Sequence, residues 1–355
     1  MVTAINVADL DPGSPDAGVA AHYGDPAREQ RVLEEGVALV DRSHRGVVAV
    51  PGADRLDWLH SLATQHLTGL APYTGSELLI LSPHGHVEHH AMLLDDGATT
   101  WLDVEPGAAG PLLDFLTRMR FMMRVEPADV TADWAVLSLV GPNTDEALTT
   151  LGVGPLLGPD VVAVPGPKFA TGAVPPRPTT VYYGAELPDF GGWARRVLGG
   201  ADLLVPRAAK ADVIEAAGAP LAGIWAYEAA RVAARRPRFG FETDHRTLPA
   251  EVGWTAQAVH LEKGCYRGQE TVSRVHHLGR PPRRLVLLHL DGISTDEVPA
   301  SHTPVLNGDG RTVGFIGTGA RHRELGLVAT AVLKQNVPAD AVLTVAESTA
   351  AIDPE

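Results

Sequence analysis

The strongest chemical signal in the sequence surrounds its single cysteine, Cys265, in the segment KGCYRGQE (263–270). Glycines on both sides of the cysteine let the backbone turn tightly and leave the sulfur approachable. Lys263 and Arg267 place positive charge beside the thiol, and a helix that begins at Gly268 would add the positive end of its dipole. These features favour the thiolate, the form that reacts or binds metal. We therefore predict a reactive thiolate at Cys265 with Lys263 as its activator; the alternative is a buried structural cysteine in a turn.

A second candidate site is the histidine-rich stretch that contains His84, His86, His89 and His90. Alternate residues of a strand share a face, so His86, Glu88 and His90 would line up and could hold a metal such as zinc. A set of three without a distant fourth ligand is weak, so we predict no metal site and favour histidines that face solvent or a ligand. His90 is the candidate proton-transferring group, since an unperturbed histidine has a pKa of ~6.5.

A basic patch, Arg42–Ser43–His44–Arg45, could attract the anionic tail of a ligand. A solvated loop is the favoured interpretation of this patch.

The periodicity of apolar residues predicts the elements that must position these groups. Asp54 is expected to cap the second helix. We expect helices over 27–39, 54–67, 110–122, 192–198, 207–217 and 224–234. Strands are expected over 46–50, 77–82, 86–94, 99–104, 134–140, 179–183 and 201–205, and short strands with Gly-rich turns from 285 onward.

This pattern predicts an α+β protein with ferredoxin-like subdomains and a small C-terminal β-barrel. Residues 1–26 have no sustained apolar period and are expected to form an extension or a loosely docked arm. The first α+β subdomain is placed at 27–150, the second, which carries the cysteine segment, at 151–279, and the barrel at 280–355.

Composition excludes several classes of function. The 355 residues include 29 Lys+Arg and 43 Asp+Glu, a net charge of −14, which disfavours direct binding to nucleic acid, although a basic patch at 274–284 exists. One cysteine allows neither an internal disulfide nor a Cys₄ site. No apolar run approaches a membrane span and the start lacks the features of a secretory signal, so we expect a cytoplasmic protein.

The segment KGCYRGQETVSR (263–274) resembles the signature of the YgfZ family, the folate-binding relatives of the glycine-cleavage T-protein (GcvT). The stretches 45–67 and 231–254 and the final strands, including Val313–Gly314, also resemble that family, so the resemblance covers about residues 30 to 335. It implies a GcvT-like folate-binding fold with a C-terminal barrel.

The resemblance also implies tetrahydrofolate or a derivative as cofactor. Trp254 lies close to the signature and could stack on a flat heterocycle, and Glu270 and Arg274 have the i,i+4 spacing of an ion pair on a helix. The residues expected to bind the cofactor are His90, Arg231, Trp254, Tyr266, Gln269, Glu270 and Arg274.

Two departures from the aminomethyltransferases stand out. Their hairpin strand carries an acidic pair that includes the catalytic aspartate, and here His89 and His90 hold those places. In their helix motif R-x-E-A-G, an acid can make paired hydrogen bonds to a pterin, whereas Arg231 is followed here by Val232 and Ala233. The T-protein reaction is therefore not expected.

We accordingly expect a folate-binding accessory protein, more a non-catalytic factor than an enzyme, that supports assembly or repair of iron–sulfur proteins and thereby tRNA modification. Cys265 would offer one ligand to a shared cluster or form a transient mixed disulfide with a client or assembly protein. The alternative is a folate-dependent aminomethyl or one-carbon transferase that uses His90. Direct tRNA binding and a ligand-binding scaffold without chemistry are two further alternatives; no membrane partner is expected.

Overall fold

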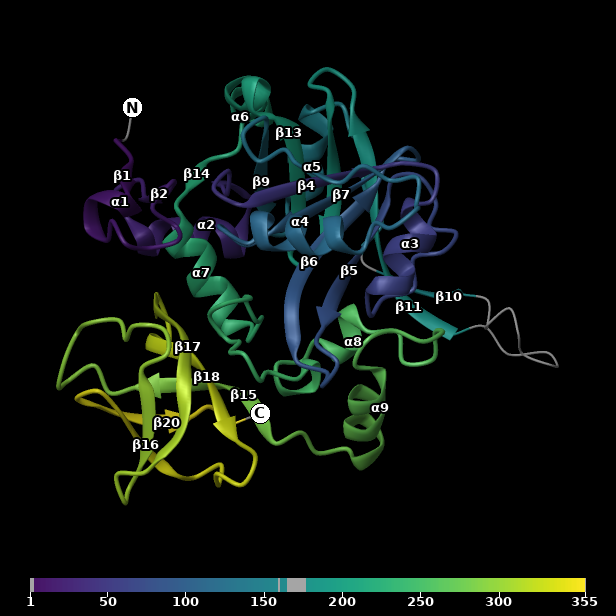
Figure 1. The fold of residues 1–355 in the computed structure, drawn as a ribbon. Coiled ribbons are helices and arrows are strands. Elements are labelled where there is room, and N and C mark those ends of the chain that lie inside the picture. The colour runs from purple at the N-terminus through teal and green to yellow at the C-terminus, as the bar shows by residue number, and fades with distance from the viewer. Residues whose placement is uncertain (1–2, 159, 165–176, 355) are drawn as a thin grey trace.

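The computed structural model describes residues 3–158, 160–164 and 177–354. They form a main body built on one large mixed sheet, and a separate closed barrel at the C-terminal end (Figure 1). The predicted combination of an α+β region and a small C-terminal barrel is confirmed.

Twelve described strands make up the large sheet, and β11 joins its two halves. Residues Gly184–Leu187 of β11 pair with β12, whereas Tyr182 and Tyr183 pair with β5. In sheet order the strands are β14 (Leu221–Ala222), β3 (Ala38–Asp41), β9 (Trp134–Val140), β13 (Gly200–Pro206), β12 (Gly192–Val197), β11 (Arg177–Leu187), β5 (Thr74–Leu81), β6 (Val87–Asp95), β7 (Thr99–Val104), β4 (Gly46–Pro51) and β8 (Ala128–Asp129), with β10 (Asp160–Val164) paired to β11.

Each half of the sheet has its own helices and core. In α4 (Ala109–Arg118), Leu112, Phe115 and Leu116 recur at helical spacing and pack with residues of α3 (Arg55–Leu62) against β4 to β7. In the other half, α5 (Thr144–Thr150) and α6 (Lys210–Ala217) pack against β9, β12 and β13. The two cores leave the seam between the halves available to polar residues.

Helix α7 (Ile224–Ala233) connects the parts of the molecule. Ala226 packs with residues of α2 (Pro26–Glu35) and β2 (Ala20–His22), whereas Ala229 and Val232 pack against the barrel. Figure 1 shows this helix running from the N-terminal arm toward the barrel. The small side chains of Ala226 and Ala229 allow close packing, so α7 contacts the N-terminal arm, the large sheet and the barrel.

The N-terminal arm, residues 3–22, is packed rather than loosely docked. It contains β1 (Ile5–Asn6), α1 (Val7–Leu10) and β2, and Val7, Val19 and Ala21 are buried. A Cβ at Gly223 would lie 2.1 Å from the carbonyl oxygen of Ala21, so glycine is required where α7 begins. The sequence pattern missed this packing because the buried residues are few and follow no period.

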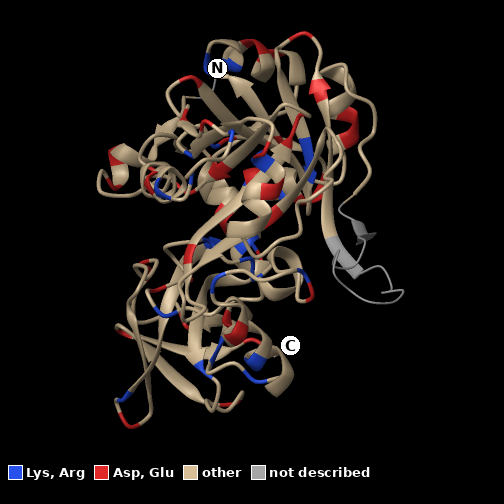
Figure 2. Ribbon diagram, turned by 45° about the vertical axis from the view of Figure 1, so that its right-hand side comes forward, with Lys and Arg blue, Asp and Glu red and all other residues tan. Residues whose placement is uncertain are grey.

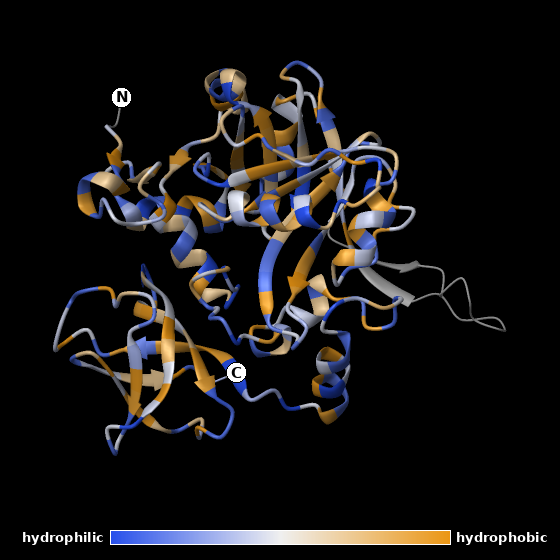
Figure 3. Cartoon of the chain, viewed as in Figure 1, coloured by the Kyte–Doolittle hydropathy of each residue, from blue (hydrophilic) through white to orange (hydrophobic). Residues whose placement is uncertain are grey.

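The barrel closes in the order β15 (Arg283–Leu290), β18 (Gly326–Lys334), β17 (Thr312–His322), β16 (Pro304–Asn307), β19 (Val342–Val345) and β20 (Ser348–Ile352). Leu288, Ile316, Ala331 and Leu343 are fully buried in its interior. Apolar segments are visible as orange runs on β17 and β18 in Figure 3.

Three local predictions are wrong. Residues 192–198, expected to be helical, include β12, because this segment is paired on both sides, with β11 and β13. The helix predicted over 27–39 ends at Glu35, and β3 begins at Ala38. Asp54 makes no capping bond; its carboxylate accepts instead from the backbone N–H and the guanidinium of Arg124.

Candidate functional site

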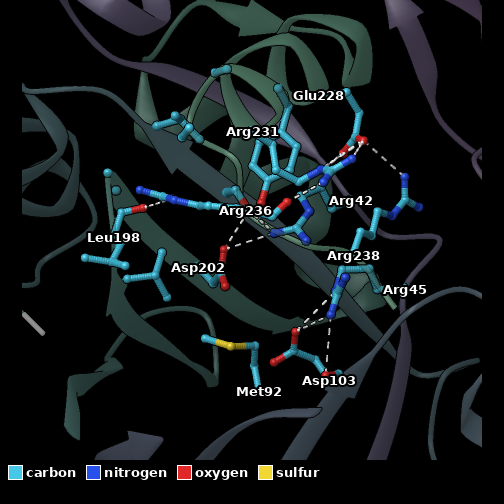
Figure 4. Close-up of a pocket in the computed structure, with 18 of the residues that line it drawn as sticks. Arg42, Arg45, Met92, Asp103, Leu198, Asp202, Glu228, Arg231, Arg236 and Arg238 are labelled. Carbon is cyan, nitrogen blue, oxygen red and sulfur yellow. Dashed lines mark hydrogen bonds and ion pairs between the residues drawn. The ribbon is translucent and has the colours of Figure 1, made fainter. Parts of the chain in front are cut away.

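A cavity of about 240 Å³ lies at the seam between the two halves of the sheet (Figure 4). Strands β5, β6 and β7 contribute Glu77, His90 and Asp103 from one half, and β13 contributes Asp202 from the other. Helix α7 and the segment that follows it close the cavity, together with Trp254. The site is therefore assembled from segments far apart in the sequence.

Charged side chains of both signs line this cavity in equal number. They are the arginines Arg42, Arg45, Arg231, Arg236 and Arg238 and the carboxylates Glu77, Asp103, Glu105, Asp202 and Glu228. Figure 2 shows blue and red positions intermixed in the middle of the main body.

Arg42 and Arg45 face the cavity instead of forming the solvated loop that the sequence favoured. Their segment joins β3 to β4, that is, one half of the sheet to the other, so it crosses the seam and its side chains are buried. The Nη1 of Arg45 donates to Glu105 at 2.5 Å, and its Nε donates to Asp103 at 3.2 Å. Chain topology buries this segment, and local composition carries no information about topology.

Glu105 is the centre of one ion-pair cluster. It accepts from Arg45 and, at 2.6 Å, from the Nε of Arg238. Burial raises the pKa of Glu105, but the guanidinium groups of Arg238 and Arg45 outweigh burial and hold that pKa well below its usual range. Glu105 is therefore a permanent anion in the cavity wall.

Asp103 and Asp202 form a second cluster around Arg195. The Nη2 of Arg195 lies 2.8 Å from Asp103 and 2.9 Å from Asp202. Arg42 adds a contact of 3.4 Å to Asp202, and Ser138 donates to the same carboxylate at 2.7 Å. Both aspartates are thus neutralised by Arg195 of β12 together with an arginine of the segment between β3 and β4.

The N-terminal arm supplies Asp16 to this network. Its carboxylate receives two hydrogen bonds from Arg238, at 2.9 and 2.5 Å, and lies 2.9 Å from the Nε2 of His44. Burial raises the pKa of Asp16, yet the bonds from Arg238 and His44 lower it below its usual range. A strong electrostatic contact therefore fixes the arm beside the cavity.

Arg231 connects the cavity to the barrel. It forms a bidentate pair with Glu228, one turn earlier on α7, and its Nη2 donates to the hydroxyl of Thr318 on β17 at 2.5 Å. Its Nη1 lies 3.4 Å from Glu242, a fully buried carboxylate that also accepts from Thr318 and Thr330. Coupled to this network, Arg231 is a fixed part of the wall.

One corner of the cavity contains two stacked aromatic rings. His90 and Trp254 stack with their planes 9° apart and their centroids separated by 4.5 Å. The Nε2 of His90 lies 2.7 Å from Glu77, and the hydroxyl of Tyr182 donates to the same carboxylate at 3.4 Å. Burial and Glu77 raise the pKa of Tyr182, so its phenol stays protonated and available as a donor.

Cys265 lies outside the cavity, in the signature loop (residues 263–268), and is exposed. As predicted, a helix begins beside this loop: α9 (Gln269–Leu278), with Gly268 at a φ of 80° before it. A Cβ at Gly268 would lie 2.6 Å from the carbonyl oxygen of Ser82. The loop is therefore packed tightly against the turn between β5 and β6.

The two cations of the signature loop have partners of their own. The Nζ of Lys263 donates to the carbonyls of His60, Ala63 and Gln65 at the end of α3. Burial lowers the pKa of Lys263 to about 7. Arg267 pairs with Glu88 of β6 at 3.0 Å, on the exposed side of the loop.

The predicted site residues fall into two groups. His90, Arg231 and Trp254 line the cavity, whereas Lys263, Cys265, Tyr266, Gln269, Glu270 and Arg274 are not among its described lining residues. Tyr266 is buried and belongs to the same apolar cluster as Trp254. Gln269 donates to the carbonyl of Lys263 at 3.2 Å, and the ion-pair geometry expected of Glu270 and Arg274 is not found within the described part of the chain.

Strand β6 links the two groups. Glu88, which binds Arg267, and His90, which lines the cavity, are two residues apart on this strand, and the ladder with β5 shifts register at Glu88. The signature loop and the cavity therefore contact neighbouring positions of one strand.

Most of the charged residues that line the cavity are not predicted from the sequence. The available signal was a single acid inside an otherwise apolar strand, as with Glu77 in GSELLIL and Asp202 in GADLLVP. A lone buried carboxylate needs a partner, so such acids mark polar seams.

Over 3–158, 160–164 and 177–354, no three His, Cys, Asp or Glu side chains are arranged to hold a metal ion. In the histidine-rich strand, His90 is directed to Glu77 and Glu88 to Arg267. None of the helices in those ranges is long and apolar enough to cross a bilayer.

Comparison with known proteins agrees with this architecture. The family model described as the GCVT N-terminal domain matches residues 20–154. The chain is a relative of the GcvT proteins. The crystal structure of the glycine cleavage system aminomethyltransferase T from Bartonella henselae superposes with a TM-score of 0.76 and 14% identity, covering 100% of this chain and 97% of that one. The predicted GcvT-like fold is thereby confirmed.

Two sequence relatives add detail. A chloroplastic Arabidopsis thaliana protein named as a transferase is 27% identical over 84% of this chain, and the chain spans 65% of that relative's length. An aminomethyltransferase of Symbiobacterium thermophilum is 26% identical over 84% of this chain and 78% of its own length. The narrower YgfZ assignment stays a prediction.

Proposed function

We propose that this GcvT-like protein binds a tetrahydrofolate in the cavity and acts as an accessory factor for iron–sulfur proteins through Cys265. The observation that carries the folate proposal is the uncompensated charge of Arg236. This residue is exposed at the edge of the cavity and donates to the carbonyl of Leu198 at 2.5 Å (Figure 4), and it has no carboxylate partner among the described residues.

A folate is flat at one end and carboxylated at the other. The stacked rings of His90 and Trp254 supply a flat apolar wall suited to the ring system. Arg236 supplies a guanidinium for the carboxylated tail. The aminomethyltransferases among the relatives support the same class of ligand.

The folate proposal is tested by isothermal titration calorimetry with tetrahydrofolate and with tetrahydropterin, which lacks the carboxylated tail. Arg236→Ala is expected to weaken tetrahydrofolate binding about 10-fold, the loss typical of one charged hydrogen bond, and to leave tetrahydropterin binding unchanged. Arg280→Ala, which replaces an exposed arginine just after the end of α9, is the matched control. Failure of the unmodified protein to bind tetrahydrofolate would refute the proposal.

The accessory role rests on Cys265. Its exposure and the adjoining α9 N-terminus favour reaction with an external partner. In cells that depend on this protein, Cys265→Ala is expected to lower the activity of cluster-containing enzymes while folate binding is retained. If the activities of the cluster-containing enzymes are unchanged, the sulfur of Cys265 has no part in the proposed role.

A folate-dependent one-carbon transferase is the second candidate, and the contact between His90 and Glu77 favours it. A histidine held by a carboxylate inside the cavity is positioned to transfer a proton. Incubation with an aminomethyl donor and tetrahydrofolate would then produce methylene-tetrahydrofolate, and His90→Ala would abolish this product. The accessory role alone predicts no product.

A further inference from the structure

Glu77 differs from every other carboxylate that lines the cavity. Asp103 and Asp202 are paired with Arg195, Glu105 with Arg45 and Arg238, and Glu228 with Arg231. Glu77 has no arginine or lysine within ion-pair distance among residues 3–158, 160–164 and 177–354. The main body thus compensates four acids with arginines and leaves the fifth without one.

Glu77 is nevertheless buried, with a side chain that is 10% exposed. A carboxylate out of water needs hydrogen-bond donors, and it can accept about four. His90 provides one donor at 2.7 Å and Tyr182 a long one at 3.4 Å. Acceptor capacity is therefore left over in the cavity, beside the stacked rings.

The position of Glu77 suits an edge-on contact with a flat ligand. Glu77 pairs across the sheet with Met92, and His90 is two residues from Met92 on the same face of β6, so Glu77, His90 and Met92 adjoin in the cavity wall. Helix α7, in contrast, lines the cavity with Ile224, Tyr227 and Ala230 and with Glu228 and Arg231, which are paired with each other. The free carboxylate of this site therefore comes from a strand and not from the helix.

We propose that Glu77 is the specificity-determining residue of the cavity, which recognises a flat heterocycle through an adjacent ring N–H and exocyclic amino group. This inference rests on the proposed folate site and adds which edge of the ligand the protein recognises. A carboxylate bonded to two adjacent N–H donors in one plane excludes heterocycles that lack the amino group, because the buried anion would then stay under-satisfied. Glu77 on β5 would thus supply the carboxylate for paired hydrogen bonds to the heterocycle, which Ala233 on α7 cannot supply.

The test compares tetrahydrofolate with its 2-desamino-2-methyl analogue, which keeps the ring and the tail but lacks the amino group. The purified full chain is titrated by calorimetry, together with Glu77→Gln and the matched control Glu146→Gln, an exposed glutamate of α5. The unmodified protein and the control are expected to prefer tetrahydrofolate by about 10-fold or more. Glu77→Gln is expected to lose this preference, by weaker binding of tetrahydrofolate with little change for the analogue.

Three results would overturn the inference, and they differ from one another. If Glu77→Gln keeps the preference, another residue reads the amino group. If it loses both ligands equally while its thermal unfolding curve matches that of the unmodified protein, Glu77 supports the cavity without selecting the ligand. If the unmodified protein binds neither compound, the proposed folate site itself fails. Glu77→Asp, which retains the charge, provides a check: partial preference is expected.

Discussion

The cavity and the signature loop are built in opposite ways. The cavity gathers buried charges from both halves of the sheet, from α7 and from the N-terminal arm, and most of them are neutralised by one another. The signature loop is a continuous segment with an exposed thiol, held by backbone contacts to α3 and to the β5–β6 turn. In the cavity most charged side chains form fixed ion pairs, whereas the signature loop leaves the sulfur of Cys265 accessible to a partner.

Charge in a site does not by itself indicate a ligand contact. Arg45 and Arg238 line the cavity, but their donors are used by Glu105, Asp103 and Asp16. Among the charged residues that line the cavity, Arg236 has no carboxylate partner and Glu77 has no arginine or lysine partner within the described chain. Substitutions in the two regions are therefore expected to lower stability in proportion to the buried charge that each leaves without a partner.

The largest effect is expected from Arg238→Ala. It leaves Glu105 and Asp16 buried with less compensation, and breaking a buried ion pair costs about 3–5 kcal/mol of unfolding free energy. Urea denaturation measures the loss. Arg311→Ala, an exposed barrel arginine, is the control, and an equal stability for both variants would contradict the assignment of Arg238 to the structural network.

Acid should destabilise the protein through His60 and His89. Burial, followed by nearby cations, lowers the pKa of each to about 4 in the folded state, below the ordinary value of ~6.5. The unfolded chain therefore binds these protons first, so stability is complete above about pH 6.5 and falls as the pH drops toward 4. The loss attributable to His89 is about 2–3 kcal/mol.

This pH dependence is measured by denaturation at a series of pH values. Replacing His89 with Phe is expected to flatten the curve between pH 6.5 and 4. The same replacement at the exposed His84 is the comparison, and two superimposable curves would show that His89 does not contribute.

Lys263→Met should weaken the base of the signature loop. Three carbonyls at the end of α3 lose their shared donor, and buried groups left without a partner cost about 1–3 kcal/mol. The rate of iodoacetamide alkylation at Cys265 distinguishes anchoring from activation. A slower reaction without a loss of stability would favour the activator role predicted from the sequence.

Cys265→Ser should have the smallest effect on stability, within about 0.5 kcal/mol, because the side chain is exposed. The thiol of the folded protein is expected to react with Ellman's reagent without denaturant. Resistance of the native thiol together with rapid reaction in guanidinium would place it in a closed environment and weaken the proposed role.

Local patterns were enough for most of the fold. The apolar spacing in α4, the two strand segments of the β5–β6 hairpin and the short C-terminal strands all form the elements that the sequence predicts. One exception, β12, is a strand because it is paired on both sides. Helix propensity within 192–198 could not indicate those neighbours.

The sequence by itself determined the chemistry that is continuous along the chain: a lone cysteine between glycines, cations on either side, and a helix beginning just after it. Only the tertiary structure decided which charges are neutralised. Ion pairs such as Asp16 with Arg238 join residues that are 222 positions apart, and a partner at that distance leaves no trace in local spacing. Coulomb energy depends on separation in space and on burial, and both are set by how the two halves of the sheet meet.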